Sequence, residues 1–279
     1  MQIIQKRKWF YILSLIIIIP GLVSLFIQGL NLGIDFKGGS ILQIRMEEKV
    51  QSAEVRAVLQ ELNLDNAEVQ KSGDEFFIRT VELDQEQFKE LQDALKNKFA
   101  NVEYLGSESV GAAIGSELTR NAILALVIAT IAMLVYITFR FEWTFGVATV
   151  IPIIHNVLIV LGVFSIFQWE ISSSFIAALL TVVGYTINDT IIIFDRVREN
   201  LRYKLKEDRM TLLNRSITQT LNRTINTVLS TTFPLIALLL FGGTNLKTFV
   251  IAMLIGFVSG AYSSICLASS LWYDIKNRA

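Results

Sequence analysis

Long apolar runs alternate with charged segments along this chain, and six of the runs are long enough to cross a membrane as helices. Each run has about 18 or more residues, the length that an α-helix needs to span the hydrocarbon core of a bilayer. The runs are Trp9–Ile27, Asn121–Phe139, Thr144–Phe167, Ser172–Phe194, Thr224–Phe241 and Thr248–Trp272. This pattern predicts a polytopic α-helical membrane protein with six transmembrane helices.

A segment of mixed polarity, residues 31–117, separates the first two runs and predicts a small α+β domain. Its strand candidates lie near residues 42–46, 67–71, 75–81 and 102–105. Ser52 and Asp84 can each cap an amphipathic helix, and a Ser-Gly-Asp turn at 72–74 joins the middle strands. The resulting β-α-β-β-α-β order favours a ferredoxin-like domain, although another small α+β arrangement of these elements stays open.

Lysine and arginine are unevenly shared among the connections, which predicts how the chain is oriented in the membrane. Lys6, Arg7 and Lys8 precede the first run, and the segment 195–215 is basic, as is the end of the chain. The short connection 168–170 has no lysine or arginine. The positive-inside rule therefore places both termini and the loop 195–215 in the cytoplasm, with the α+β segment outside.

Three parts are expected along the chain. They are a cytoplasmic N-terminus with the first helix (1–30), an extracytoplasmic domain (31–117), and helices two to six with a cytoplasmic C-terminus (118–279). The first run is too long for a signal peptide, and no small-residue cleavage site follows it, which indicates a retained anchor. We expect a multi-pass protein of the cell (plasma) membrane.

Composition narrows the class of function. Hydrophobic residues make up 52% of the sequence and its mean hydropathy is +0.50, in agreement with a membrane protein. The net charge is zero, so no nucleic-acid partner is expected. Cys266 is the only cysteine and cannot form an internal disulfide. No Gly-x-x-x-x-Gly-Lys phosphate loop occurs. We predict no enzyme activity, no cofactor and no metal site.

One acidic residue, Asp189, interrupts the apolar part of the fourth run. A carboxylate in hydrocarbon costs roughly 2.5–3.5 kcal/mol on insertion scales, so a compensating partner is expected. Thr181 and Tyr185 precede Asp189 at four-residue steps and share its helix face, and Asn188 lies beside it. This polar lining predicts a functional site within the membrane.

The expected partner is Arg223, at the start of a polar stripe on the fifth run. The members of the stripe are Arg223, Asn226, Thr227, Ser230, Thr231 and Pro234. Asp189 follows Glu170 by nineteen residues, and Gly242 follows Arg223 by nineteen. At 1.5 Å per residue, both charges lie about 28 Å from the outer surface. The equal depth predicts that they pair.

A buried carboxylate beside an arginine can act as a proton switch. Protonation of Asp189 would release Arg223 and let the two helices repack. The membrane potential supplies about 2.3 kcal/mol per charge per 100 mV, enough to bias such a two-state element. The alternative is a static ion pair in which Arg223 extends its side chain to the inner interface.

Three further features are candidates of lower specificity. His155, next to Asn156 in the third run, either joins a proton path or is a structural hydrogen-bonding residue. Gly256 and Gly260 form a Gly-x-x-x-Gly pattern, which predicts close helix approach within the chain or with a partner. The charged stretch 195–199 is expected to be a solvated helix end, with a docking surface as the alternative.

Three stretches resemble signatures of the SecD/SecF family of protein-export subunits, and within it the SecF members. The stretches are Gly33-Ile-Asp-Phe-Lys-Gly-Gly39, Val183–Asn200, and Thr218–Thr224 followed by Phe241–Gly243. In the first stretch the signature residues are Gly33, Asp35, Phe36, Gly38 and Gly39. By this resemblance Asp189 and Arg223 stand at ion-coupling positions. The family often has His-Asp where this chain has His155-Asn156, so a second carboxylate is missing from the third helix.

The resemblance implies a membrane subunit of bacterial protein export in the resistance-nodulation-division superfamily. Such a subunit acts with SecD, here expected as a separate chain, and with the SecYEG channel, and YajC is a further candidate partner. It uses the proton or sodium motive force to pull unfolded exported polypeptide outward through late steps of translocation, and membrane lipid surrounds it.

Two other hypotheses stay open. The chain could be half of a small-molecule or lipid exporter of the same superfamily, or an assembly factor whose ion pair only holds helices together. An exporter would need a large outer domain with an apolar cleft, and residues 31 to 117 number only 87. The short outer segment favours the protein-export subunit.

Overall fold

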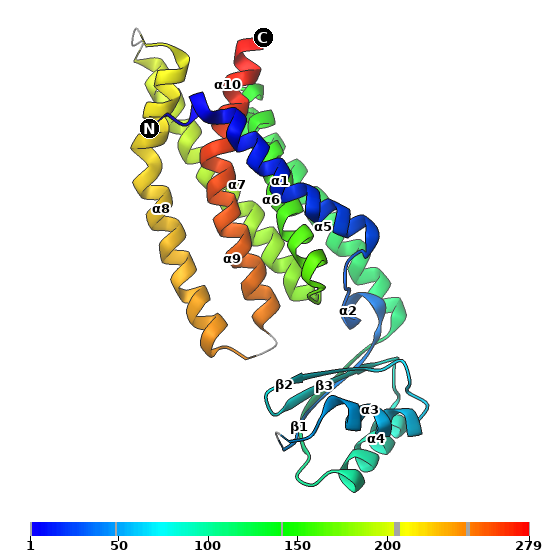
Figure 1. Ribbon diagram of the computed structural model, residues 1–279. Helices are drawn as coiled ribbons and strands as arrows, with labels where there is room; N and C mark the ends of the chain where they lie inside the picture. The colour runs from blue at the N-terminus through cyan, green and yellow to red at the C-terminus, as the bar shows by residue number, and fades with distance from the viewer. Residues whose placement is uncertain (1, 48, 141, 204–206, 244–245, 279) are drawn as a thin grey trace. The chain divides into compact units, whose positions relative to one another are not determined.

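The computed structural model describes residues 2–47, 49–140, 142–203, 207–243 and 246–278. Its helices are η1 (Ile4–Lys6), α1 (Arg7–Ile27), α2 (Ile34–Lys37), α3 (Ser52–Glu61), α4 (Gln85–Lys98), α5 (Ala112–Arg140), α6 (Trp143–Phe167), α7 (Ser173–Arg202), α8 (Arg209–Phe241), α9 (Lys247–Tyr262), the π-helix η3 (Ser263–Ala268) and α10 (Ser269–Arg278). Its strands are β1 (Gly39–Arg45), β2 (Glu68–Ser72), β3 (Glu75–Thr80) and β4 (Glu103–Val110) (Figure 1). The chain forms two units, Met1–Asn31 with Leu124–Ala279, and Leu32–Ile123.

Six helices in the described part of the chain are long and apolar enough to span a membrane, which confirms the predicted number. They are Ile4–Ile27, Ala112–Arg140, Trp143–Phe167, Ser173–Arg202, Arg209–Phe241 and Lys247–Asn277. The last combines α9, η3 and α10 into one continuous helical segment. The protein is therefore a multi-pass membrane protein.

Several helices extend beyond the apolar runs, and the predicted loop 195–215 is largely helical. Helix α7 continues to Arg202, and α8 begins at Arg209 instead of Thr224. The extension of α8 is amphipathic and buries Leu213 and Ile217 in the core of its unit, so it gains packing that hydropathy alone does not report. The connection between them shrinks to 203–208, of which 204–206 lie outside the described residues.

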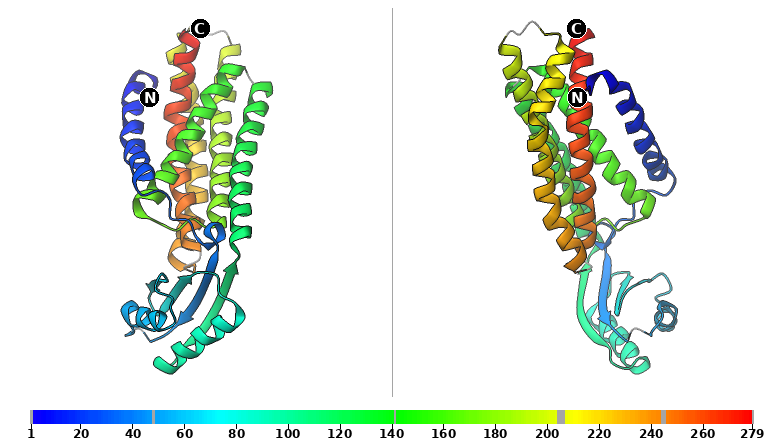
Figure 2. Two further views of the ribbon diagram at one scale, coloured as in Figure 1. Left: turned by 90° about the vertical axis from the view of Figure 1, so that its right-hand side faces the viewer. Right: turned by 60° about the vertical axis from the view of Figure 1, so that its left-hand side comes forward.

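The first unit is a bundle in which α6, α7 and α9 pack against one another. Helix α8 packs on α7 and α9, and α1 packs on α6 (Figure 2). Both chain termini lie at the same end of this unit (Figures 1 and 2). Near that end Arg7 of α1 forms a 2.8 Å ion pair with Asp274 of α10. The last turns of the chain are therefore tied to its first helix.

Helices α1 and α6 approach closely at a pair of glycines. A Cβ added to either Gly21 or Gly162 would lie 2.8 Å from the Cα of the other, closer than two carbons pack. One turn further along, the hydroxyls of Ser24 and Ser165 lie 2.7 Å apart and share a hydrogen bond. The close contact thus depends on small residues on both helices.

The second unit holds a four-stranded antiparallel sheet in the order β2-β3-β1-β4. Strand β1 pairs with β3 from Ser40↔Thr80 to Arg45↔Glu75, and it pairs with β4 on its other side. The predicted β-α-β-β-α-β order is confirmed, and β4 runs to Val110, further than the predicted 102–105.

Both helices predicted in this unit are present and contribute to its core. Leu42 and Ile44 of β1 form one apolar cluster with Val55 of α3 and Leu91 and Leu95 of α4. Asp84 caps α4 as expected, because its carboxylate accepts from the Gln87 backbone amide at 2.8 Å while the Gln87 side chain accepts from the Asp84 amide. Ser52 is the first residue of α3, and Gln51 occupies its N-cap position without a capping side chain.

The glycine pair that opens β1 has a steric role in this unit. Gly38 and Gly39 adopt φ of 75° and 131°, a region that residues with a Cβ rarely occupy. A Cβ on Gly38 would also lie 2.8 Å from the Cα of Ala112, and one on Gly39 would lie 2.5 Å from the Thr80 carbonyl oxygen. Gly33 is the N-cap residue of α2, which contains Asp35 and Phe36, so the signature forms one short helix followed by a tight glycine junction before the sheet.

Candidate functional site

Asp189 lies in the middle of α7 and is completely buried. Its exposed fraction is 0%, and neither carboxylate oxygen has a hydrogen-bond partner within the structure. A buried charge without a partner is among the costliest arrangements in a protein. Structures keep such a group where function requires it, so Asp189 is the centre of the candidate site.

Arg223 does not pair directly with Asp189, and the register of the two helices explains why. No ion pair within 4 Å joins these two described residues. The Thr231 hydroxyl donates to the Tyr185 hydroxyl at 3.4 Å, and Asn200 donates to Ser216 at 2.8 Å. These contacts place Thr227 level with Asp189, so Arg223 lies about 6 Å further along α8. The predicted equal depth is wrong by one helical turn.

Arg223 nevertheless stays within electrostatic range of the site. It lies one helical turn from Thr227, the residue level with Asp189, and its side chain lies on the surface of the chain. A long and flexible arginine can extend along its helix by several ångströms. The two charges are therefore one turn apart, near enough to interact but separated in this structure.

The other residues predicted to line the site are distributed over different surfaces. Tyr185 contacts α8 through Thr231 and α9 through Phe257, whose ring centre lies 4.3 Å from its own. Thr181, Asn188 and Asn226 are exposed on the surface of the chain. Thr227 donates to the carbonyl oxygen of Arg223 on its own helix. Of the predicted polar lining, Tyr185 is therefore the side chain that links α7 to its neighbours.

Asn156 is the centre of a buried hydrogen-bond network that the sequence pattern did not reveal. Its side chain is 1% exposed and donates to the Thr186 hydroxyl at 2.7 Å and to the Gly256 carbonyl oxygen at 3.1 Å. Its amide oxygen accepts from the Ser259 hydroxyl. One side chain on α6 thus binds both α7 and α9.

The network continues along α7 into the π-helix η3. The hydroxyls of Thr190 and Ser264 lie 2.9 Å apart, and the Ser264 hydroxyl donates to the Thr186 carbonyl oxygen at 3.2 Å. π-Helical turns within α-helices occur often at functional sites. The spacing of Thr186, Thr190, Ser259 and Ser263 at four-residue steps was a signal for this face, although threonine and serine are common in membrane helices.

His155 is buried beside this network but does not take part in it. Its exposed fraction is 6%, and neither ring nitrogen has a hydrogen-bond partner in the described structure. Its ring centre lies 6.1 Å from that of Tyr262, which donates to the Phe10 carbonyl oxygen at 2.8 Å. The hydrogen-bonding role considered for this histidine is therefore not seen, and its place in a proton path stays a prediction.

The Gly-x-x-x-Gly pattern brings α9 close to α7 within the chain. A Cβ on Gly256 would lie 2.2 Å from a methyl carbon of Val182, and one on Gly260 would lie 2.7 Å from the Thr186 hydroxyl oxygen. This confirms the predicted close approach and assigns it to helices of one chain. The approach lets the Gly256 carbonyl reach Asn156.

No cluster of three or more histidine, cysteine, aspartate or glutamate side chains occurs among the described residues, so none is assigned to a metal. The site thus consists of an unpaired carboxylate on α7, a cation one turn away on α8, and a satisfied polar network on the neighbouring face. Such an arrangement can take up a cation or a proton at Asp189 while the network holds the helices.

Comparison with known families adds two matches. Residues 90–278 match the family described as protein export membrane protein SecD/SecF, C-terminal, and residues 23–50 match the SecD/SecF GG motif. The second match contains Gly38 and Gly39. Together the matches include Asp189, Arg223, Asn156 and most of the membrane helices.

Individual relatives agree over nearly the whole chain. The protein translocase subunit SecF of Sebaldella termitidis is 40% identical over 99% of this chain and 92% of its own length. The crystal structure of SecDF, a translocon-associated membrane protein from Thermus thermophilus, superposes with a TM-score of 0.93 at 38% identity. The structure of SecDF in a super-membrane-facing form gives a TM-score of 0.75 at 37% identity. All of this chain is covered in both cases, but it spans only 39% of each SecDF chain.

Proposed function

This chain belongs to the SecD/SecF family of protein-export membrane proteins, and we propose that it is an ion-coupled subunit of the export machinery. In this role it takes up a proton, or a sodium ion, from the membrane gradient and uses the energy to assist late steps of polypeptide translocation. The substrate is an unfolded exported polypeptide.

The observation that carries this proposal is the buried and unpartnered carboxylate of Asp189. A residue kept only to hold helices together would be hydrogen-bonded, as Asn156 and Thr186 are. An unpaired acid within the membrane is suited to bind and release an ion instead. This contrast favours ion coupling over a purely structural role.

Arg223 supplies the second half of the proposed switch. With Asp189 charged, extension of the Arg223 side chain along α8 would bring the guanidinium to the carboxylate. With Asp189 neutral, the arginine would return toward the membrane interface. Because Tyr185 and Thr231 join α7 to α8 at 3.4 Å, a change at this pair would be transmitted to the packing of both helices.

We propose further that both termini are cytoplasmic and that the small domain lies outside the cytoplasm. The basic residues near the termini and between α7 and α8 support this orientation. The sheet order β2-β3-β1-β4 and its two helices support a ferredoxin-like arrangement for the domain. Alkaline phosphatase fused after residue 105 should be active, and a fusion at the C-terminus should be inactive. The reverse result would refute the orientation.

SecD is the proposed first partner. The SecDF of Thermus thermophilus joins a chain like this one to further sequence, and this chain spans 39% of it. A separate SecD chain would supply the remainder, and the pair would act on the SecYEG channel, with YajC as an additional candidate.

The central experiment measures export into inverted membrane vesicles that contain SecD and the Asp189→Asn variant. With a proton gradient imposed, we expect the export rate to fall to the rate without a gradient, because asparagine cannot carry the ion. Asp195→Asn is the matched control, since Asp195 is an exposed carboxylate on the same helix. A sodium gradient in place of the proton gradient identifies the ion.

Normal gradient-driven export by Asp189→Asn would exclude ion coupling at this residue and favour a structural role. Loss of export by Asp195→Asn to the same extent would show that any lost carboxylate on α7 has this effect. The amount of each variant in the membrane and its elution as a single species in detergent separate a lost function from a lost fold.

A further inference from the structure

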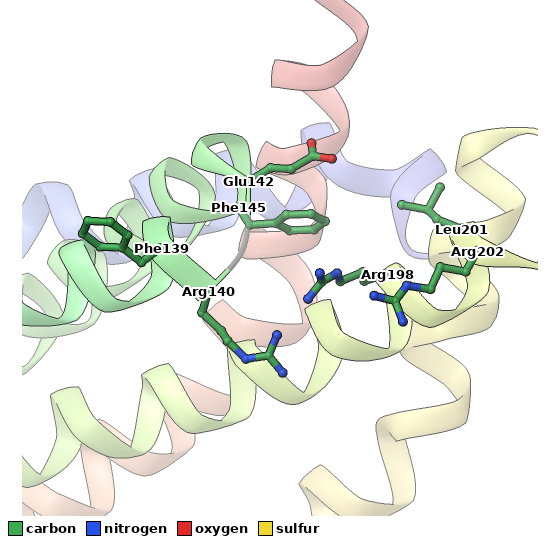
Figure 3. A pocket seen from close by; sticks show the side chains of 7 residues that line it. All are labelled: Phe139, Arg140, Glu142, Phe145, Arg198, Leu201 and Arg202. Atoms are coloured by element: carbon green, nitrogen blue, oxygen red, sulfur yellow. The ribbon is translucent and has the colours of Figure 1, made fainter.

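A pocket of about 470 Å³ lies at the end of the first unit where α5 ends, α6 begins and α7 ends (Figure 3). The residues that line it are Phe139, Arg140, Glu142, Phe145, Arg198, Leu201 and Arg202. Its volume is in the range of sites that bind small molecules. The ion-coupling proposal does not use this pocket, and Asp189 is not among its residues.

The pocket carries an excess of positive charge. Figure 3 shows the guanidinium groups of Arg198 and Arg202 turned to the same side of the pocket as that of Arg140, whereas the Glu142 carboxylate points away from them. Glu142 is already neutralised, because it accepts from Lys276 in a 2.8 Å ion pair. The described lining of the pocket therefore holds three arginines and a single carboxylate, whose charge is already balanced by Lys276.

Arg202 is the member of this group with the most freedom to bind a ligand. It is exposed, and it forms no hydrogen bond or ion pair with any residue that the structure describes. Arginine binds phosphate through parallel hydrogen bonds from its planar fork, and several arginines can share one phosphate. The pocket is thus chemically suited to a phosphate group.

Apolar side chains beside the arginines make the pocket amphipathic. Phe139 and Leu201 line the pocket and are 89% and 39% exposed, and Trp143, which follows Glu142 in the sequence, is 59% exposed. Aromatic residues at the ends of membrane helices lie at the level of the lipid headgroups, and basic pockets between helices at this level bind anionic headgroups. A ligand with a phosphate and attached acyl chains satisfies both surfaces, which a soluble phosphate does not.

We propose that this pocket binds the phosphate of an anionic phospholipid, with the arginines on the headgroup and the acyl chains along Phe139 and Leu201. The proposed topology places the pocket in the cytoplasmic leaflet. The inference rests on that topology and not on ion coupling, so Asp189→Asn should bind the lipid as the wild-type chain does.

The test uses the full chain in nanodiscs of phosphatidylcholine with increasing fractions of phosphatidylglycerol, and native mass spectrometry counts the bound lipid. Arg202→Gln should weaken phosphatidylglycerol binding about tenfold, the size expected for one lost charge-assisted contact. The triple variant R140Q/R198Q/R202Q should lose specific binding. Arg196→Gln is the matched control, because Arg196 lies on the same helix but does not line the pocket.

Competition with inorganic phosphate separates the two sources of the group. Little displacement of phosphatidylglycerol by inorganic phosphate supports a lipid site. Complete displacement of the lipid by phosphate overturns the proposal in favour of a soluble phosphate ligand. The proposal would also be overturned if Arg202→Gln bound phosphatidylglycerol as the wild type does, or if Arg196→Gln lost as much binding as Arg202→Gln. It would be overturned as well if the wild-type chain bound phosphatidylcholine as tightly as phosphatidylglycerol. An acidic peptide is added in a separate competition. If it displaces the lipid from the pocket, the pocket is assigned to a protein partner instead. Arg202→Lys keeps the charge and should recover part of the binding.

Discussion

Two neighbouring faces of helix α7 bury polar side chains, and they differ in how those side chains are satisfied. Thr186 and Thr190 face α6, α9 and η3, and each makes hydrogen bonds to another helix. Asp189 lies between them in sequence but about 100° around the helix from Thr190, and its carboxylate has no partner. The first face stabilises the bundle, whereas the second lowers its stability, so the same helix serves structure on one side and function on the other.

Filling the close contact on the satisfied face should have the largest effect. Gly256→Leu would drive a side chain into Val182, where even a Cβ lies 2.2 Å away, and should lower the free energy of unfolding by about 2–3 kcal/mol. Unfolding of the chain in mixed micelles of dodecylmaltoside and sodium dodecyl sulfate measures this. Gly184→Ala is the control, because a Cβ there meets no atom within 4 Å, and it should change the stability by less than about 1 kcal/mol. Similar losses in both variants would contradict the contact.

Removing the centre of the network should have the next largest effect. Asn156→Leu deletes hydrogen bonds to Thr186 and Gly256 and leaves their buried polar atoms without this partner, which should cost about 1–2 kcal/mol of unfolding free energy. The same unfolding assay measures it, and Ile159→Leu on the same helix provides an apolar control. A stability equal to that of the wild type would show that the network does not hold the three helices.

Removing the charge from the unsatisfied face should act in the opposite direction. Asp189→Asn replaces an unpaired buried carboxylate by a neutral side chain of nearly the same shape, so unfolding free energy should stay equal or rise by up to about 1 kcal/mol. The variant should therefore be at least as stable as the wild type while its ion-driven export is lost. A loss of stability like that of Asn156→Leu would mean that Asp189 is a structural residue.

The smallest effect is expected at the link between the two sides of the proposed switch. Tyr185→Phe removes a long hydrogen bond of 3.4 Å from Thr231 and keeps the ring contact with Phe257. The unfolding free energy should change by less than about 0.5 kcal/mol. Thr231→Val also removes the bonds from this hydroxyl to carbonyl oxygens of its own helix, so comparison of the double variant with both single variants isolates the contact between the two hydroxyls.

Hydropathy predicted the six spans because the bilayer imposes a single requirement on them, a long uncharged run. It could not predict where α7 ends and α8 begins, since the first turns of α8 are stabilised by amphipathic packing through residues such as Leu213 and Ile217. In the second unit, the alternation of apolar and polar residues and the capping residues were local signals for strands and helices, and Asp84 caps its helix as expected.

The candidate site was predicted in identity but not in geometry. Asp189 was conspicuous because charge is rare in an apolar run. Its distance from Arg223 depended on the relative level of two helices, which counting from the outer connections misjudged by one turn. The Asn156 network was missed because threonine and serine can bond to their own helix, and sequence does not say which of them also meet a neighbour.

The attachment of α1 has a consequence for the order in which the protein is assembled. Gly21 packs on Gly162, the backbone amides of Ile3 and Ile4 donate to Asn214, and Arg7 pairs with Asp274. The first helix is therefore synthesised long before the three segments that receive it. Its contact with α6 can form once that helix has been made, whereas the ion pair of Arg7 with Asp274 can form only after α10 has been synthesised.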